Sequence, residues 1–403
     1  MKALDITHLE KQPDTYALFG DDGHVYIARH GQPPASMAQL PNIAADKEIK
    51  LYVHEPWVCV TERFGTRAAL VHMESGSVRE LCRGDYHANV SSYSIGFLER
   101  EGRVLLIHQT EWNRLDIMDA ATGECLTGRE VYYRQIKPWY SEENEAWITP
   151  ADEIKNYLDY FHSLLHVSPD GAHFLSNGWI WHPIGQIICF HTDDFFKRYE
   201  YSHIPLAYSS DYNWDSPCTF IGHDKFVVAV DDPQKNWLSD REDRVGYPYK
   251  QLQFYCLSTP AEEIESGITV VKKSTPAEKT QLGLSVLKKE RDAFCTAFMP
   301  DEDGRVHGEL AWDAAYETIA AITPEGAFAI HLNGNVLEMI SECRCKAEKT
   351  YKGTVSSENL DIGWHYYPQR HLLYHWSQEA EEIETRRFDC MKDENRRIHS
   401  DQG

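Results

Sequence analysis

Hydrophobic and polar residues form short alternating blocks along residues 164–196, LLHVSPDGAHFLSNGWIWHPIGQIICFHTDDFF. Three blocks rich in β-branched and aromatic residues are separated by a Pro-Asp-Gly turn and by a gap, and the last block ends near an acidic turn. Each block is too short for a helix, and proline followed by glycine suits a tight reversal of the chain. The segment therefore predicts a hairpin followed by a third strand.

The same order of strands and turns recurs elsewhere in the chain. Strong copies occupy residues 56–81 and 96–126, and residues 16–31 supply a partial copy of two strands. Weaker copies occupy residues 219–232 continued by 250–259, 309–340 and 361–388. Together with the first segment these make seven candidate units, and six or eight are the alternatives because insertions make the intervals uneven.

Repeated sheet units of this kind predict a ring. The chain has 403 residues, more than one hydrophobic core usually serves. Repeats of roughly forty to fifty residues with about four strands each bury their faces against neighbouring repeats, so a ring of them needs no second domain. We therefore expect an all-β fold, a β-propeller of about seven four-stranded blades with helical or irregular insertions. It should be a single domain over residues 1–390, followed by a polar C-terminal tail over 391–403.

Two short motifs resemble those of known propellers. HVSPDGAHFLS (166–176) resembles the strand, turn and strand of WD40-like propellers, and DIMDAATGECL (116–126) is similar to the outer hairpin of WD40 and quinoprotein-like blades. No predicted blade ends in Trp-Asp, and Gly-His dipeptides occur only in turns, at 23–24 and 222–223. The resemblance is therefore to the WD40-like or YVTN-like β-propeller superfamily as an architecture, and it implies the fold.

Insertions between the strands carry the candidate binding residues. Residues 131–163 hold aromatic side chains among polar ones, and TPADEIKNYLDYF (149–161) predicts a short helix capped by Thr149. Aromatic residues also gather in 208–217 and 231–249 beside a run of acids. Such side chains are favoured in binding surfaces, and packing onto the protein's own blades is the alternative. The candidates are Trp139, Tyr140, Trp147, Trp214, Trp237, Tyr247 and Tyr249.

Charge and hydropathy exclude some classes of binding partner. Sixty-three acidic and forty basic residues give a formal charge of -23, which repels nucleic acid. The first residues, MKALDITHLEKQPD, lack the apolar core of a secretory signal, and no stretch approaches the roughly eighteen apolar residues that span a bilayer. The ten cysteines are scattered, mostly in strand-like runs, and are expected to be reduced. We therefore expect a cytoplasmic protein that contacts neither membrane nor nucleic acid.

Catalytic and metal-binding motifs are weak in this sequence. Phosphate-binding glycine loops and a complete G-x-S-x-G elbow are absent. His162 and His166 are four residues apart on a predicted strand and hence about 13 Å apart, too far to share one ion alone. Cys343 and Cys345 have no second ligand pair at zinc-finger spacing. One closer histidine group, expected to be structural, is His173, His182 and His191.

These observations favour a non-catalytic binding or scaffolding protein. We expect a monomer without cofactor or metal that binds a protein or peptide on one face of the ring. A regulatory partner of a protein that seeks acidic surfaces is a related hypothesis. The alternative from another class is a propeller enzyme acting on a glycan or small molecule, with carboxylates at the central channel. Three or more acids or histidines within hydrogen-bonding reach at the ring centre would favour it, and the first acids to inspect are Asp116, Asp119, Asp215 and Asp231.

Overall fold

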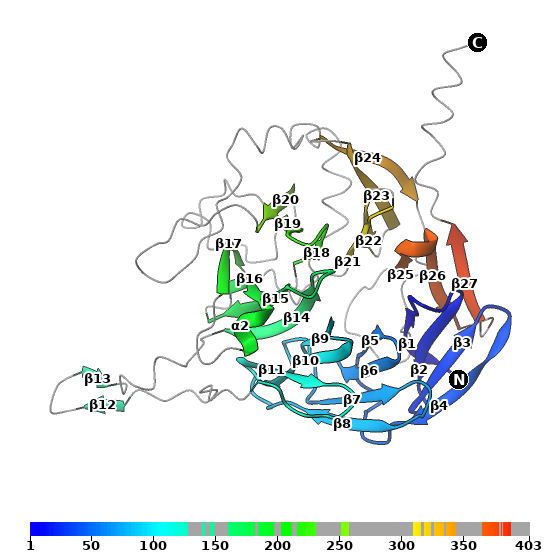
Figure 1. Cartoon of the computed structure of the whole chain (residues 1–403), viewed down its shortest axis with the longest axis horizontal. Helices are drawn as coiled ribbons and strands as arrows, with labels where there is room; N and C mark the ends of the chain where they lie inside the picture. The colour runs from blue at the N-terminus through cyan, green and yellow to red at the C-terminus, as the bar shows by residue number, and fades with distance from the viewer. Residues whose placement is uncertain are drawn as a thin grey trace, which may run out of the picture.

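Antiparallel sheets make up almost all of the regular structure. The computed structural model describes residues 1–127, 139–141, 146–148, 160–181, 184–196, 203–211, 216–230, 251–257, 309–315, 318–323, 326–333, 336–343, 365–378, 380 and 382–387. These residues form eight sheets, of which seven have three or four strands and one is a two-stranded hairpin. The seven larger sheets stand around a common centre (Figure 1). The predicted all-β propeller is therefore confirmed, with each large sheet one blade.

The first three blades come from the first 119 residues of the chain. Blade 1 consists of β1 (Ala3–His8), β2 (Thr15–Gly20), β3 (His24–Arg29) and β4 (Gln32–Gln39). Blade 2 consists of β5 (Ile49–His54), β6 (Trp57–Glu62), β7 (Arg67–His72) and β8 (Val78–Cys82). Blade 3 consists of β9 (Ile95–Arg100), β10 (Arg103–Glu111) and β11 (Arg114–Asp119).

The other four blades follow in chain order. Blade 4 consists of β14 (Phe161–Val167), β15 (His173–Ile180), β16 (Ile184–His191) and β17 (His203–Asp211). Blade 5 consists of β18 (Cys218–Phe220), β19 (Lys225–Val230) and β20 (Gln251–Cys256). Blade 6 consists of β21 (Glu309–Asp313), β22 (Thr318–Thr323), β23 (Gly326–Asn333) and β24 (Val336–Cys343). Blade 7 consists of β25 (His365–Tyr367), β26 (Leu372–Ser377) and β27 (Glu382–Arg387).

Each of the seven repeat units in the sequence corresponds to one blade. The fragment at 16–31 belongs to a complete four-stranded blade, whereas blades 3, 5 and 7 have three strands within the described residues. The acidic turn after β16 forms a short helix, α2 (Thr192–Phe196), and the turn η2 (Pro368–Arg370) joins β25 to β26. The helix expected over 149–161 is wrong at its end, because Phe161 begins β14. Residues 149–159 and the expected tail over 391–403 lie outside the described residues.

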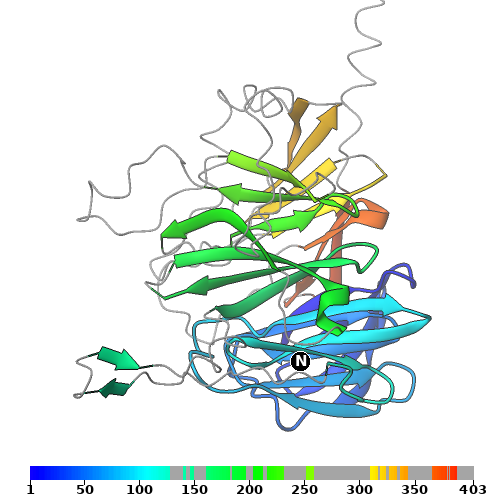
Figure 2. The ribbon, with the colours of Figure 1, turned by 60° about the vertical axis from the view of Figure 1, so that its left-hand side comes forward.

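Blade faces alternate between two neighbours, which explains the unbroken apolar runs in the strands. In β2, Ala17 and Phe19 pack toward blade 2, whereas Tyr16 and Leu18 pack toward blade 7. Successive side chains of a strand point to opposite faces of the sheet, so a blade between two others needs apolar residues at every position. The core therefore consists of layers between blades, which stack face to face (Figure 2).

The ring closes where blade 7 meets blade 1. Within the described residues these two blades share no strand, and side chains join them instead. The Tyr367 hydroxyl donates to the Leu9 carbonyl at 2.9 Å, and Gln378 Nε2 donates to the Ala3 carbonyl at 3.0 Å. The His8 backbone N–H donates to the Tyr374 hydroxyl at 3.2 Å. Both the apolar layer and these hydrogen bonds therefore link the two ends of the chain.

A buried arginine fixes the connection between blades 2 and 3. Arg83 follows β8, and its guanidinium uses all five N–H donors within the protein. Burial lowers its pKa to about 10, and it also lies 4.8 Å from the centroid of the Tyr93 ring. No carboxylate is among its hydrogen-bond acceptors, so carbonyl dipoles stabilise the charge. The acceptors are the backbone oxygens of Gly65, Ala88, Ser91 and Ser92 and the side-chain oxygen of Gln109.

Replacing this arginine should strongly destabilise the protein. Arg83→Met keeps the aliphatic stem but leaves buried oxygens without donors, so we expect the free energy of unfolding to fall by about 3–5 kcal/mol. Arg67→Met, at an exposed position on β7, should change it by less than about 0.5 kcal/mol. Urea denaturation followed by circular dichroism measures both. Equal small effects from the two variants would contradict the role assigned to Arg83.

Two tyrosines at the closure should respond oppositely to loss of their hydroxyl. Tyr367→Phe removes the hydrogen bond to Leu9 and should lower the free energy of unfolding by about 1 kcal/mol. The buried Tyr16 hydroxyl has no hydrogen-bond partner among the described residues, so Tyr16→Phe should leave stability unchanged or raise it. The same denaturation experiment compares them, and a larger loss for Tyr16→Phe would refute the assignment.

Candidate functional site

The aromatic residues singled out in the sequence fall largely outside the described part of the chain. Residues 139–141 and 146–148 form the hairpin of β12 (Trp139–Ser141) and β13 (Ala146–Ile148). Its register places Tyr140 opposite Trp147 and Trp139 opposite Ile148. The residues that lie outside are Trp214, Trp237, Tyr247 and Tyr249. Convergence of the two groups on one face of the ring stays a prediction.

The carboxylates first considered for catalysis have structural partners. Asp116 and Asp119 lie on β11, which is the third strand of blade 3 counted outward from the ring centre. Asp116 accepts hydrogen bonds from the Thr110 and Thr127 hydroxyls and pairs with Arg114 at 2.9 Å. Asp119 accepts the backbone N–H groups of the following turn, which lowers its pKa. The structure therefore places neither at the ring centre, and Asp215 and Asp231 lie outside the described residues.

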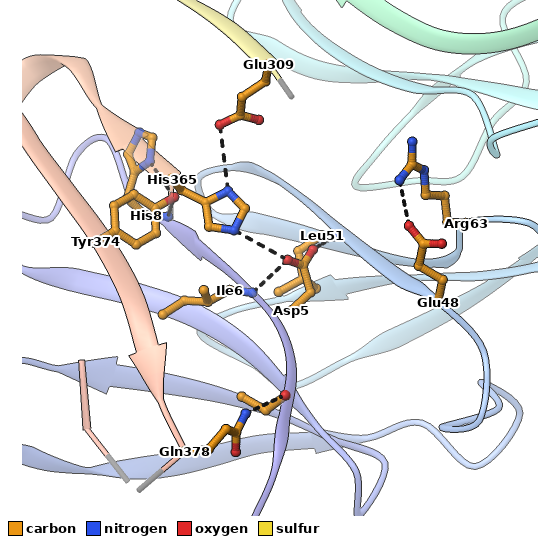
Figure 3. Close-up of polar contacts among 11 residues, drawn as sticks. Asp5, Ile6, His8, Glu48, Leu51, Arg63, Glu309, His365, Tyr374 and Gln378 are labelled. Carbon is orange, nitrogen blue, oxygen red and sulfur yellow. Dashed lines mark hydrogen bonds and ion pairs between the residues drawn. The ribbon is translucent and has the colours of Figure 1, made fainter. Parts of the chain in front are cut away.

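A different set of ionisable residues meets at the centre of the ring. Figure 3 shows His365 of β25 between two carboxylates. Its Nδ1 lies 3.7 Å from Oε1 of Glu309 on β21, and its Nε2 lies 4.0 Å from Oδ1 of Asp5 on β1. His8, also on β1, has its Nδ1 3.2 Å from the Tyr374 hydroxyl. These residues come from blades 1, 6 and 7.

Electrostatics couple this central cluster to two further strands. Desolvation alone would raise the pKa of Glu309, but the adjacent imidazole of His365 and the charge of Lys50 on β5 outweigh it and lower the pKa to about 2. Burial lowers the pKa of His8 to about 4, and it does the same to His166 on β14. Near neutral pH the ring centre therefore holds an ionised Glu309, with 42% of its side chain exposed, beside two uncharged imidazoles.

Both carboxylate oxygens of Asp5 in this cluster accept hydrogen bonds from the backbone. One of its oxygens accepts the Ile6 N–H at 2.9 Å and the other accepts the Leu51 N–H of β5 at 2.6 Å. Burial raises its pKa even though Lys50 and His365 oppose that effect. An inner strand leaves one edge of N–H groups without a sheet partner, and Asp5 satisfies one of them. The cluster thus joins blades 1, 2, 6 and 7.

Metal binding finds no support in the part of the chain that the structure describes. No three His, Cys, Asp or Glu side chains converge there in a way that could hold an ion. His173 and His191 do meet across β15 and β16, with ring centroids 4.9 Å apart and the rings perpendicular. His182 lies outside the described residues. The two imidazoles therefore form an edge-to-face contact, and the structural role expected for this group stays a prediction.

A second group of side chains forms an aromatic surface. Phe161 at the start of β14 and Trp179 near the end of β15 are register partners, and their rings stack 3.7 Å apart at an interplanar angle of 3°. Trp112, from the β10–β11 turn, lies 4.3 Å from Phe161. Above this buried base stand two rings with large exposed areas, Tyr86 at 42% and Trp181 at 38%. With His87, these residues constitute the aromatic surface.

His87 sits at the middle of the aromatic surface. Its backbone φ is +54°, in the left-handed region that side chains other than glycine rarely adopt. Desolvation lowers its pKa, so the imidazole is uncharged at neutral pH. Asp85 is exposed beside it, and the carboxylate of Glu111 lies against the backbone of Gly84. The surface therefore combines uncharged rings with an acidic border.

The sequence contained one signal for this surface. Trp179 and Trp181 are two residues apart at the end of a predicted strand, and such residues point to the same face. The two rings are indeed neighbours, with centroids 5.7 Å apart. No local pattern connects them to Tyr86, which precedes blade 3, so only the fold shows the group as a whole.

Comparison with known proteins gives only distant structural similarity. No protein-family model and no curated protein matches the chain. Similar solved structures include Hsv2 from Kluyveromyces lactis, at 9% identity and a TM-score of 0.46, covering 85% of this chain and 87% of that one. Another is the β-propeller domain of Cps50 (Swd1) from Myceliophteria thermophila, at 12% identity and a TM-score of 0.46, covering 95% and 96%. A functionally unknown protein from Desulfotomaculum acetoxidans DSM 771 has 9% identity and a TM-score of 0.43, covering 96% and 92%.

The fold assignment therefore rests on the seven blades of the chain itself. Among the described residues, no helix is long and apolar enough to cross a membrane.

The central cluster should make stability depend on pH. His8 and His166 have folded pKa values of about 4 against an ordinary 6.5, so the unfolded chain binds more protons between these limits. The free energy of unfolding should fall as pH drops from 6.5 toward 4. His166→Asn should reduce that slope by up to about 1 kcal/mol per pH unit. Urea denaturation across this range measures it, and an unchanged slope would show that His166 is already protonated in the folded state.

Proposed function

We propose that this protein is a non-catalytic binding protein whose aromatic surface holds a segment of a protein partner. The observation that carries the proposal is the exposure of Tyr86 and Trp181 above a buried, stacked base. Such rings lose little conformational entropy on binding, and tyrosine and tryptophan supply a large share of binding energy at interfaces. Water-exposed aromatic rings on a rigid support are suited to that role.

The acidic border indicates the chemistry of the partner. Asp85 is exposed directly before Tyr86 in the chain, and the chain as a whole carries a formal charge of -23. Arg114, the cation of the nearby β10–β11 turn, is paired with Asp116. A basic segment would be attracted by this field over a distance of about 10 Å at moderate salt. We therefore propose a positively charged peptide segment as the occupant.

Catalysis at the ring centre, the alternative function, has weaker support. The central cluster contains the acids and histidines that such an enzyme needs. However, both oxygens of Asp5 accept backbone N–H groups, and the low pKa of Glu309 makes it a weak proton acceptor. These features suit a structural contact that links blades better than a general acid and a general base in catalysis. An enzymatic role stays a prediction for activity assays to test, as does location in the cytoplasm.

Partner binding should depend on the exposed rings. The immobilised protein would first capture partners from an extract of its source cells, and each candidate would then be purified and titrated by calorimetry. Tyr86→Ala and Trp181→Ala should each weaken the affinity of the true partner at least about tenfold, because exposed aromatic anchors typically contribute more than 1 kcal/mol. Affinity should also fall as salt rises.

Val78→Ala is the matched control for these variants. Val78 has the same 42% exposure as Tyr86 but lies on the outer strand β8. It should leave the affinity within about twofold. A partner that binds both aromatic variants as tightly as the wild type would show that the interaction uses another surface, and the proposal would fail.

A further inference from the structure

We propose that the aromatic surface binds a polyproline II segment, an extended left-handed helix rich in proline, that carries a basic residue beside its prolines. This inference rests on the proposed function and specifies the conformation and composition of the partner's segment. It follows from the span of the exposed rings, from their unused hydrogen-bond donors, and from the backbone of the loop that carries two of the rings.

Three neighbouring rings make up the outer part of the aromatic surface. The centroid of the His87 imidazole lies 4.5 Å from that of Tyr86 and 5.1 Å from that of Trp181. The two exposed rings are therefore at most about 10 Å apart, and a polyproline II segment of four residues, rising about 3.1 Å per residue, spans about 9 Å. Because this helix has three residues per turn, prolines at its first and fourth positions share a face and can contact both exposed rings.

Trp181 offers a ring on which no other ring of the described residues stacks. Its contacts with His87, Phe161 and Trp179 are all close to perpendicular, at interplanar angles of 84°, 84° and 86°. The side chain is also 38% exposed. Flat apolar rings pack well against an indole, and the pyrrolidine ring of proline is one that is already rigid before binding.

The hydrogen-bond donors of the two exposed side chains complement a proline-rich backbone. Among the described residues, neither the Tyr86 hydroxyl nor the Trp181 indole N–H has a hydrogen-bond partner. A polyproline II backbone makes no internal hydrogen bonds, and proline contributes a carbonyl acceptor without an N–H donor. The carbonyls of such a segment therefore accept the donors that these two side chains present.

The loop before blade 3 suits neither a strand nor a helix as the bound segment. Addition of a strand needs a free strand edge, but this loop turns in on itself, since the His87 carbonyl accepts the N–H groups of Val90 and Ser91. A helix uses its carbonyls internally, so it cannot accept from Tyr86 and Trp181. An extended segment that is recognised through side chains matches the surface.

The charges of the same loop favour a basic residue beside the prolines. Asp85 is exposed directly before Tyr86, and the whole chain carries a formal charge of -23. Desolvation lowers the pKa of His87, so its imidazole is uncharged at neutral pH and does not repel a cation. Arg83 is buried, with its donors used by oxygens of the protein. A lysine or arginine of the partner would therefore meet an exposed carboxylate on this loop.

Three peptides of equal length test the proposal on the full chain. The first is a run of about ten prolines flanked by lysines, the second has Gly-Ser repeats in place of the prolines, and the third has glutamates in place of the lysines. Titration at constant ionic strength, followed by saturation-transfer NMR of the peptide, should give the first a Kd at least about threefold lower than either of the others. If either preference is missing, including the case in which no peptide binds, the proposal fails.

Two variants test the ring and the donor separately. Trp181→Ala should raise the Kd of the lysine-flanked proline peptide at least about fivefold. Tyr86→Phe keeps the ring but removes the hydroxyl, so it should raise the Kd about two- to fivefold without disturbing the fold. Val78→Ala, on the outer strand β8, should leave the Kd within about twofold. Unchanged binding by either aromatic variant would refute the contacts on which the proposal rests.

The outcome also separates this inference from the proposed function. If the proline peptide does not bind while a protein partner still depends on Tyr86 and Trp181, the polyproline inference is wrong and the binding function stands. A partner whose bound segment is helical or lacks proline would have the same meaning. If a partner binds independently of both rings, both proposals fail.

Discussion

Burial of both faces of every blade is the constraint on which this structure depends. Leu18 and Phe19 are adjacent in β2, yet one packs toward blade 7 and the other toward blade 2. A single blade would expose both sets of side chains to water, and each fully buried leucine or phenylalanine contributes roughly 1.5–3 kcal/mol. No blade is therefore expected to be stable alone, and the first blade needs the last one, more than 350 residues away in the sequence, to complete its core.

The same ring geometry requires polar residues at the centre. Inner strands present backbone N–H groups that no further strand can pair with, and a group such as Asp5 must satisfy them. His365 then lies between the carboxylates of Asp5 and Glu309. A cluster of acids and histidines at the centre of a propeller is thus expected from folding alone, so its presence is weak support for catalysis. An active site would need polar atoms that folding does not already use.

Features formed by residues that are close in the sequence could be predicted, whereas features formed by residues far apart in the sequence could not. Local signals were sufficient for the blades. The Pro-Asp-Gly turn forms as expected, with Gly171 at φ +68° and the Ser168 hydroxyl bonded to Asp170. The helix expected to reach Phe161 is wrong there because Phe161 pairs with Trp179 of β15, and the Tyr160 hydroxyl lies within hydrogen-bond distance of the Ser176 and Gln186 carbonyls of blade 4. Helical propensity cannot anticipate these contacts. The aromatic surface was missed for the same reason, because its members come from blades 3 and 4 and from the loop before blade 3.

The two layers of the aromatic surface differ in what folding requires of them. The lower layer is fully accounted for by the fold: Phe161 and Trp179 stack across paired strands, and the Trp179 indole donates to the Ser91 hydroxyl at 2.8 Å. The upper layer is not, since Tyr86 and Trp181 leave much of their apolar area in water, where it stabilises nothing. His87 adds backbone strain at the same place. Exposed apolar area and strain both oppose folding, and they coincide at one position beside a rigid base. A bound partner would cover this exposed apolar area, as an exposed aromatic patch on a rigid support favours, whereas the polar groups of the ring centre are already used by folding.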